Sequence, residues 1–316
     1  MENVIKIGVS ACVVGHKVRF DSGHKTSAFL SKELSPYVEF MPICPEVAIG
    51  MSVPRPTIRL QFKGERIALV ETKNTDNEHT DKMVAFSDQK ARELIDEQLC
   101  GYVVCRNSPT CGMEKVKVYS KHNAEKIGVG LYTQKLIEHM PWLPIEEDGR
   151  LTDPYLKENF ILRVFALSDF YQTMGDNPTA GKVVAFHSRY KLTLMAHHPE
   201  SYKELGRLVA NLGDVDIDSF INEYRLLFMN ALKHRANRKT NTNVLMHLQG
   251  YLKNSLDKQQ KKELAELILD YRSGISPLLA PLTLIKHHLS LHPDEYLSQQ
   301  CFFQPYPQEL RLRYGM

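Results

Sequence analysis

The segment Gly101-Tyr102-Val103-Val104-Cys105, followed by Arg106-Asn107-Ser108-Pro109-Thr110-Cys111-Gly112, decides the fold that we expect for the first half of the chain. The first five residues form a short apolar run bounded by turn residues, which predicts a buried strand. Cys111 then lies in a loop just beyond the end of that strand. Open α/β sheets bind their ligands at this edge.

Two further cysteines occupy equivalent positions in the sequence. Cys12 follows the apolar segment 4–9, and Cys44 follows the apolar segment 37–43. Both segments are typical of buried strands. We therefore expect three strand ends to deliver three thiols to one edge of a sheet, where they form a single site.

The composition limits the class of protein. The chain has 316 residues and 43% hydrophobic residues, enough for two domains with full cores. No run approaches the roughly 20 apolar residues of a membrane span, and the first residues resemble a strand rather than a signal peptide. The six cysteines are too few for a disulfide scaffold and indicate metal binding or catalysis. We therefore expect a cytoplasmic protein.

The small net charge of +3 conceals a local excess of basic residues. Residues 1–150 carry 20 basic and 20 acidic side chains, whereas residues 151–316 carry 20 and 17. Between Arg225 and Lys262 there are nine basic residues and one acid, Asp257. A local excess of this kind favours an anionic partner.

The first half alternates predicted strands and helices, with one hairpin. This order predicts an α/β domain built on a mostly parallel, doubly wound sheet. We place its end at residue 150, before Thr152-Asp153-Pro154. Beyond the three strands already named, the predicted elements are a helix at 26–34, a hairpin of strands 58–62 and 66–71, a helix at 81–99, a helix at 124–140 and a strand at 142–145.

The second half, residues 151–316, contains helical patterns and little else. Its apolar residues recur at helical spacing, and Thr179 is placed to cap a helix. We therefore predict an all-α domain. The expected helices are 156–171, 179–198, 199–212, 217–233, 243–256, 258–271, 276–291 and 294–300.

Cys12, Cys44 and Cys111 have no fourth partner at a familiar spacing. Structural zinc needs four ligands, usually in short paired spacings, and the chain has no C-x-x-C. An iron–sulfur cluster held by three thiolates would leave one iron open as a Lewis acid for a soft atom such as sulfur. The alternative is that these cysteines only fill space in the core. Cys105 is interpreted as packing, with a role as fourth ligand left open.

Polar residues beside these loops are candidates for chemistry. Glu46 could transfer protons, or it could cap a helix or pair with Arg19 or Arg55. Ser108 could orient a substrate, or it could stabilise the turn before Pro109. For Arg19, Asp21 and Arg55, substrate binding competes with structural ion pairs.

Four motifs together resemble the thiouracil desulfidase family. They are S-A-C-V-V-G (10–15), V-R-F-D-S-G-H-K (18–25), C-P-E-V-A-I-G-M-S-V-P-R-P (44–56) and S-P-T-C-G (108–112). The resemblance covers residues 1 to about 150. It implies a [4Fe-4S] cluster bound by Cys12, Cys44 and Cys111, with Glu46 and Ser108 as catalytic candidates.

The chain departs from that family at two positions. Thr110 stands where the family usually has serine, which keeps the hydroxyl group. Cys105 stands where the family usually has lysine, so a role of that lysine in binding substrate is in doubt here.

The second half resembles the YbgA-type C-terminal domain. The resemblance rests on H-S-R-Y-K-L-T-L-M-A-H-H (187–198), N-V-L-M-H-L-Q-G-Y-L-K (243–253), P-L-T-L-I-K-H-H (281–288) and P-Y-P-Q-E-L-R-L-R (305–313). The whole chain thus resembles the two-domain tRNA 4-thiouridine desulfidases. Phosphate contacts supply affinity for nucleic acid, and the candidate RNA-binding residues are Lys233, Arg235, Arg238 and Lys239. The alternative is a solvated basic helix face.

The leading hypothesis is a desulfidase that converts 4-thiouridine in tRNA to uridine and sulfide without net redox change. In this hypothesis the open iron takes the thiocarbonyl sulfur, and Glu46 helps water attack the ring carbon. A second hypothesis keeps this chemistry but assigns free thiouracil or a thionucleoside as substrate. A third is a non-catalytic iron–sulfur sensor that binds nucleic acid, for which Cys105 as fourth ligand would be evidence.

Overall fold

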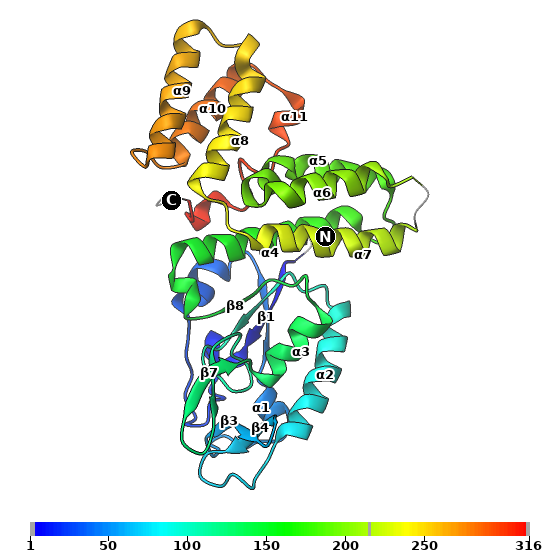
Figure 1. Cartoon of the computed structure of the whole chain (residues 1–316), viewed down its shortest axis with the longest axis vertical. Coiled ribbons are helices and arrows are strands. Elements are labelled where there is room, and N and C mark those ends of the chain that lie inside the picture. The colour runs from blue at the N-terminus through cyan, green and yellow to red at the C-terminus, as the bar shows by residue number, and fades with distance from the viewer. Residues whose placement is uncertain (1–3, 214–215, 314–316) are drawn as a thin grey trace. The chain divides into compact units, whose positions relative to one another are not determined.

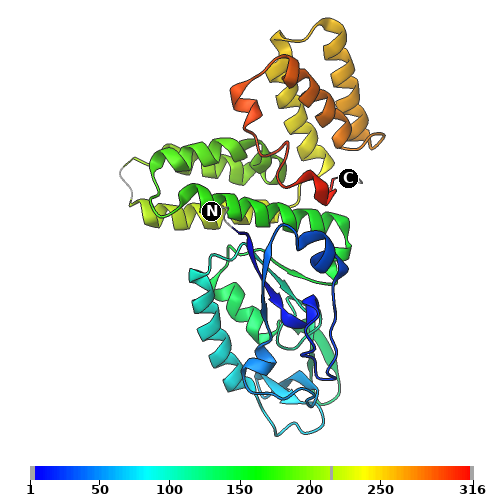
Figure 2. The same ribbon diagram turned by 180° about the vertical axis from the view of Figure 1, so that it is seen from behind.

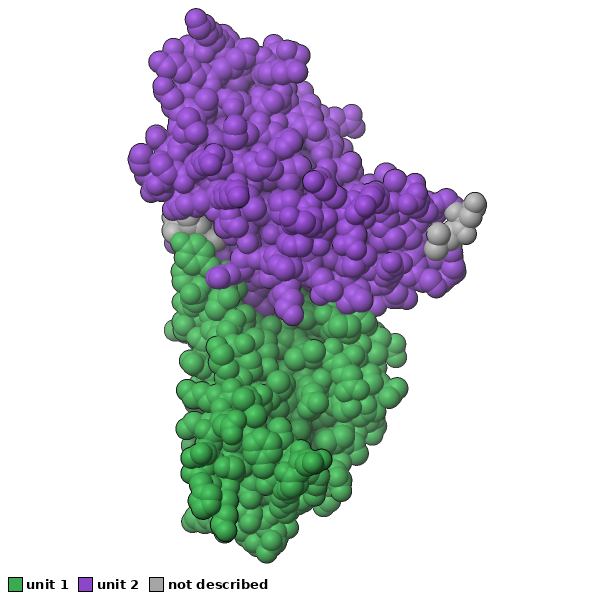
Figure 3. All heavy atoms as spheres, in the orientation of Figure 1, with its two compact units in different colours: residues 1–156 green, residues 157–316 purple. Residues whose placement is uncertain are grey.

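The computed structural model describes residues 4–213 and 216–313, and the chain divides into two compact units. Unit 1 comprises Met1–Leu156 and unit 2 comprises Lys157–Met316; Figure 3 distinguishes them by colour. The division lies six residues beyond the boundary expected from the sequence, within the first turn of helix α4, which begins at Pro154.

A four-stranded parallel sheet, sheet A, forms the centre of unit 1. Its order is β2 (Glu39–Ile43), β1 (Lys6–Ser10), β5 (Gly101–Val104) and β8 (Ile145–Glu147). Such strands are buried on both faces and read as continuous apolar runs, as β5 does with all four residues buried. The predicted α/β class with a mostly parallel sheet is confirmed.

A second sheet, sheet B, has mixed pairing and was predicted only in part. Its order is β4 (Arg66–Glu71), β3 (Ile58–Lys63), β6 (Val116–Tyr119) and β7 (Ala124–Gly128). The hairpin of β3 and β4 is confirmed. The predicted helix 124–140 is wrong in its first part, because β7 pairs antiparallel with β6 and the helix α3 spans only Leu131–His139.

Helices cover one face of sheet B. Helices α2 (Thr80–Asp96) and α3 lie side by side, as both ribbon views show (Figures 1 and 2). Their apolar residues pack on the inward side chains of the sheet. This cluster contains Leu60, Leu69, Met83, Val116, Val118 and Leu131. The remaining short elements of unit 1 are the 3-10 helix η1 (Ala11–Val14), the π-helix η2 (Phe29–Leu34), the single-turn helix α1 (Pro45–Ala48) and the 3-10 helix η3 (Arg150–Thr152).

Unit 2 is helical in its described residues, as predicted. The α-helices are α4 (Pro154–Met174), α5 (Ala180–His197), α6 (Pro199–Ala210), α7 (Ile217–Lys233), α8 (Arg238–Tyr251), α9 (Lys258–Ser273), α10 (Leu279–Leu291) and α11 (Glu295–Ser298), with 3-10 turns η4 (Leu252–Asn254) and η5 (Gln308–Leu310). Phe170, Phe186 and Phe228 form an aromatic core between α4, α5 and α7, and aliphatic residues join α8, α9 and α10. Within the described residues, no helix combines the length and apolarity of a membrane span.

Gly130 lies against the loop that carries Cys111. A Cβ atom at this position would stand 2.4 Å from the carbonyl carbon of Thr110 and 2.6 Å from the amide nitrogen of Cys111. Its backbone angles, φ −61° and ψ 136°, suit any residue. Glycine is therefore required at this position because the backbone of the cysteine loop lies so close, and not because of its backbone angles.

Replacing Gly130 with alanine should destabilise unit 1, because the cysteine loop must move to admit the methyl group. We expect a loss of about 1–3 kcal/mol in the free energy of unfolding, as for other overpacked sites. Urea unfolding of the full chain measures it. Gly250→Ala is the matched control: no atom stands within 4 Å of its Cβ position, and alanine in this helix should be neutral or stabilise by up to about 1 kcal/mol. If both substitutions change the free energy of unfolding equally, Gly130 is not required for the close approach to the cysteine loop.

Candidate functional site

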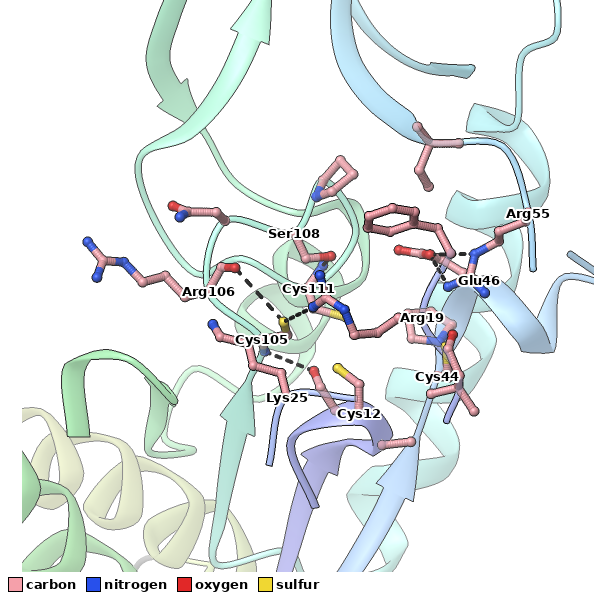
Figure 4. Close-up of a pocket in the computed structure, with 18 of the residues that line it drawn as sticks. Cys12, Arg19, Lys25, Cys44, Glu46, Arg55, Cys105, Arg106, Ser108 and Cys111 are labelled. Carbon is pink, nitrogen blue, oxygen red and sulfur yellow. Dashed lines mark hydrogen bonds and ion pairs between the residues drawn. The ribbon is translucent and has the colours of Figure 1, made fainter. Parts of the chain in front are cut away.

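A cavity of about 450 Å³ opens at the carboxyl edge of sheet A. Cys12, Cys44 and Cys111 line it together with Cys105, and Figure 4 shows these four side chains grouped around it. All four are free thiols. The parallel register explains the grouping, since Ser10 pairs with Ile43 and Val9 pairs with Val103, so the three strands end at the same level.

The loop that carries Cys111 is held by hydrogen bonds from within and from β8. The Ser108 Oγ accepts from the backbone amides of Thr110 (3.2 Å) and Cys111 (3.1 Å). Asp148, just beyond β8, accepts from the amide of Arg106 at 2.8 Å and pairs with Lys25 at 2.9 Å. The turn role expected for Ser108 is therefore present.

The thiols lie in a setting that disfavours their free anions. Burial raises the pKa of Cys111 to about 12 and also raises the pKa of Cys44. Hydrogen bonding to Cys105 and burial raise the pKa of Cys12. A metal that binds these sulfurs therefore has to displace protons.

Cys105 belongs to the cavity as well as to the core. It is 6% exposed, which agrees with the predicted packing role. Its sulfur nevertheless accepts a hydrogen bond from Cys12, which lowers the pKa of Cys105. The Arg19 Nη1 stands 3.9 Å from the same sulfur. The sequence leaves a role of Cys105 as fourth ligand open and marks this position as a departure from the family, but it does not reveal the contact with Cys12.

Glu46 is held in one orientation by two partners. Its Oε2 accepts from the Nε of Arg55 at 2.8 Å and also from the Nη2 of the same guanidinium. Its Oε1 accepts from the Thr110 hydroxyl at 2.8 Å. The arginine side chain is 3% exposed and the glutamate side chain 14%, so the ion pair is almost buried. Glu46 lies in the one-turn helix α1, which begins directly after Cys44.

Thr110 connects the two catalytic candidates. Its hydroxyl donates to Glu46, so the contact between Thr110 Oγ1 and Ser108 Oγ at 2.9 Å requires Ser108 to be the donor. The result is a hydrogen-bond chain from Ser108 through Thr110 to Glu46. The sequence did not reveal this role of Thr110, and the only hint was that it keeps the hydroxyl of the family serine.

The three substrate-binding candidates occupy different positions. Arg19 and Arg55 line the cavity, although Arg55 is bound to Glu46 and to the carbonyl of Ser52. Asp21 is absent from the described residues that line the cavity; it accepts from the amide of Gly23 and stands 3.8 Å from Arg19. Its role in substrate binding stays a prediction.

The candidate RNA-binding residues lie around the α7–α8 connection of unit 2. Lys233 ends α7, Arg235 lies in the connection, and Arg238 and Lys239 begin α8. All four are exposed. Arg238 has a structural task too, because its Nη1 donates to the Tyr271 carbonyl at 2.9 Å.

Comparison with known proteins assigns both halves of the chain. Residues 191–307 match the family described as a protein of unknown function, DUF1722. The Escherichia coli (strain K12) protein YbgA, described as uncharacterized, is 40% identical over 159 residues, which is 50% of this chain and 94% of YbgA. The chain belongs to the YbgA family.

The half outside the YbgA-like region has a match of its own. Residues 7–148 match the family described as 2-thiouracil desulfurase. The chain thus combines a 2-thiouracil desulfurase-like first domain with a YbgA-like second domain. A solved structure described as the [4Fe-4S]-dependent thiouracil desulfidase TudS covers 50% of this chain and 99% of its own, at 23% identity and a TM-score of 0.39, too distant to bear on the site.

Removing Arg55 should destabilise unit 1 because it leaves Glu46 buried without its partner. For Arg55→Met we expect a loss of about 3–5 kcal/mol in the free energy of unfolding. The double variant E46Q/R55M should recover part of that loss, since the uncompensated charge is gone. Urea unfolding measures all three proteins.

An exposed pair provides the control for this change. Arg92 pairs with Asp88 at 3.0 Å with its side chain 66% exposed, so Arg92→Met should cost less than about 1 kcal/mol. If Arg55→Met lowers the free energy of unfolding no more than Arg92→Met does, the Glu46–Arg55 ion pair does not stabilise the fold.

Proposed function

We propose that this protein is an iron–sulfur-dependent desulfidase that removes sulfur from 4-thiouridine in tRNA, giving uridine and sulfide. The observation that carries the proposal is the meeting of three free thiols and an oriented carboxylate in one cavity. The match of residues 7–148 to the 2-thiouracil desulfurase family supports the same chemistry.

The chemistry of the donor set suits an iron–sulfur cluster. Thiolates are the ligands that such clusters prefer. Among the described residues, no group of three or more His, Cys, Asp or Glu side chains is arranged to hold a metal ion. Cys12, Cys44 and Cys111 would hold the cluster, which leaves one iron without a protein ligand.

The side chains around the cavity have distinct tasks in this proposal. When bound, a cluster with one open iron supplies a Lewis acid that draws charge from the thiocarbonyl carbon. Glu46, aligned by Arg55, takes a proton from the attacking water at a carboxylate oxygen. Ser108 and Thr110 keep the carboxylate oriented through their hydrogen bonds. The oxygen of water replaces the sulfur, which leaves as sulfide, so no electron donor is needed.

Support for tRNA as the substrate comes from charge in unit 2. Arg238 and Lys239 occupy the first turn of α8, where the helix dipole disfavours cations. In the described residues no acidic side chain pairs with Lys233, Arg235 or Lys239. Such unneutralised charge suits a polyanion, and phosphate contacts supply affinity without sequence preference.

Two other functions compete with this one. A desulfidase of free thiouracil or a thionucleoside uses the same cavity, and rising salt should not weaken its activity as it does for tRNA. A non-catalytic iron–sulfur sensor is favoured by one observation, the contact of Cys105 with Cys12 inside the cavity. Iron held by four protein sulfurs, detected spectroscopically, would support the sensor.

Cys111→Ala should abolish desulfuration, because it removes one of three cluster ligands. The anaerobically reconstituted full chain should convert thiolated tRNA to the uridine form, with sulfide released in equal amount. Iron content and the visible spectrum of the variant should fall together with activity. Cys301→Ala, in unit 2, is the control and should keep both. Desulfuration by protein that contains no iron would refute the proposed mechanism.

Thr110→Val should lower kcat by about 10- to 100-fold with little change in KM. General-base catalysis typically accelerates a reaction by a factor of about 10²–10⁴, and this variant loses only the alignment of the base. The variant keeps the shape of the side chain but breaks the hydrogen-bond chain to Glu46. Thr110→Ser keeps the hydroxyl and should restore most of the rate. If the serine and valine variants have the same kcat, the chain has no catalytic part.

A further inference from the structure

A second cavity of about 450 Å³ adjoins the thiol cavity. The two cavities share the residues 106, 107 and 109 of the cysteine loop, together with Ile58. Five basic side chains line the second cavity, and no acidic residue is among the described residues that line it. The basic residues are Arg59, Arg106, Lys115, Lys117 and Lys126.

Sheet B explains why these charges gather on one side. Successive residues of a strand point to opposite faces. Leu60, Val116 and Val118 face the helices and are buried. Arg59, Lys117 and Tyr119 alternate with them and therefore lie on the opposite face of β3 and β6. We call this surface, with Lys126 of β7, the basic face.

Two lysines of the basic face oppose each other directly. Lys117 pairs with Lys126 in the register of β6 and β7, and both are exposed. Like charges in directly opposite positions destabilise a sheet. No ion pair involving either lysine is found in the part of the chain that the structure describes. The repulsion is therefore uncompensated within the described protein.

The other cations of this cavity are also weakly neutralised. Arg59 donates to the side-chain oxygen of Gln61 and lies over the ring of Tyr119 at 5.0 Å. Among the described residues, the acidic partners of Arg106 and Lys115 stand at 3.9 Å (Glu147) and 4.0 Å (Glu114), and the two basic side chains are 54% and 72% exposed. Arg150 nearby differs, because it hydrogen-bonds both Glu114 and Glu146.

We propose that the basic face binds the phosphodiester backbone of an RNA strand beside the thiolated nucleotide whose base enters the thiol cavity. The inference rests on the proposed function and adds to it a surface of unit 1 that binds the RNA backbone. Residues 106, 107 and 109 line both cavities, so a strand on the basic face would lie next to the thiol cavity. Arg59, Lys117 and Lys126 of the basic face, with Arg106 and Lys115 in the same cavity, provide more positive charge than one phosphate needs.

A binding experiment tests the basic face without any cluster or turnover. The full chain is titrated with the trinucleotide UpUpU and with uridine at several salt concentrations. K117Q/K126Q should bind UpUpU about tenfold more weakly than the unmodified chain. The slope of log K against log salt should become less steep by about 1.4, which is about 0.7 for each of two phosphate contacts.

A matched variant separates this effect from net charge. K73Q/K82Q removes two exposed lysines of unit 1 that line neither cavity, and it should bind UpUpU like the unmodified chain. Equal weakening by both double variants, or equal binding of UpUpU and uridine by the unmodified chain, would overturn the proposal. Binding of UpUpU that survives in K117Q/K126Q with an unchanged salt slope would do the same.

Activity gives a second, separate readout. With reconstituted protein, the ratio of kcat/KM for a thiolated trinucleotide to that for 4-thiouridine should fall about tenfold in K117Q/K126Q through KM, and it should be kept in K73Q/K82Q. A chain that desulfurates nothing but binds UpUpU through these lysines would refute the proposed function and leave the basic face standing. A chain that desulfurates both substrates with a ratio insensitive to K117Q/K126Q would refute the basic face alone.

Discussion

The parallel pairing of β1 with β2 and β5 is the constraint on which the site depends. It places three strand ends at one level, and each end is followed within a few residues by a cysteine. Neither the loops nor the thiols are close in sequence, so only this pairing brings them together. The hydrophobic burial of the sheet, in which Ile7, Val9 and Val103 are fully buried, therefore provides the free energy that assembles a polar site.

Around these thiols the structure keeps its polar groups in fixed positions. Glu46 has the Arg55 guanidinium on one oxygen and the Thr110 hydroxyl on the other. Removing a charge pair of this kind from water is costly unless every partner is satisfied, so the network has little freedom to rearrange. Such preorganisation is what a carboxylate needs in order to act on a water molecule at one defined place. The same contacts make Arg55 a positioning residue in this structure.

The sequence predicted sheet A well and sheet B poorly, for a physical reason. The central strands of sheet A, β1 and β5, are almost entirely buried, so their apolar runs stand out in the sequence. In β7, by contrast, residues 124–127 are all exposed, and backbone pairing with β6 rather than an apolar pattern defines the strand. The motif cysteines and Glu46 could be found as residues because their neighbours are distinctive. Their contacts could not, since Thr110 meets Glu46 across 64 positions of the chain.

Charge counting failed for a related reason. The first 150 residues have equal numbers of acidic and basic side chains, so their net charge gives no sign of a basic surface. A strand, however, separates neighbouring residues onto opposite faces, so Glu125 and Lys126 cancel in the count without lying on the same side. Lys117 and Lys126 come together only through the register of two strands, β6 and β7, neither of which the sequence predicted. The charge on each face of a sheet thus depends on how its strands pair, and counting charged residues along the sequence does not reveal it.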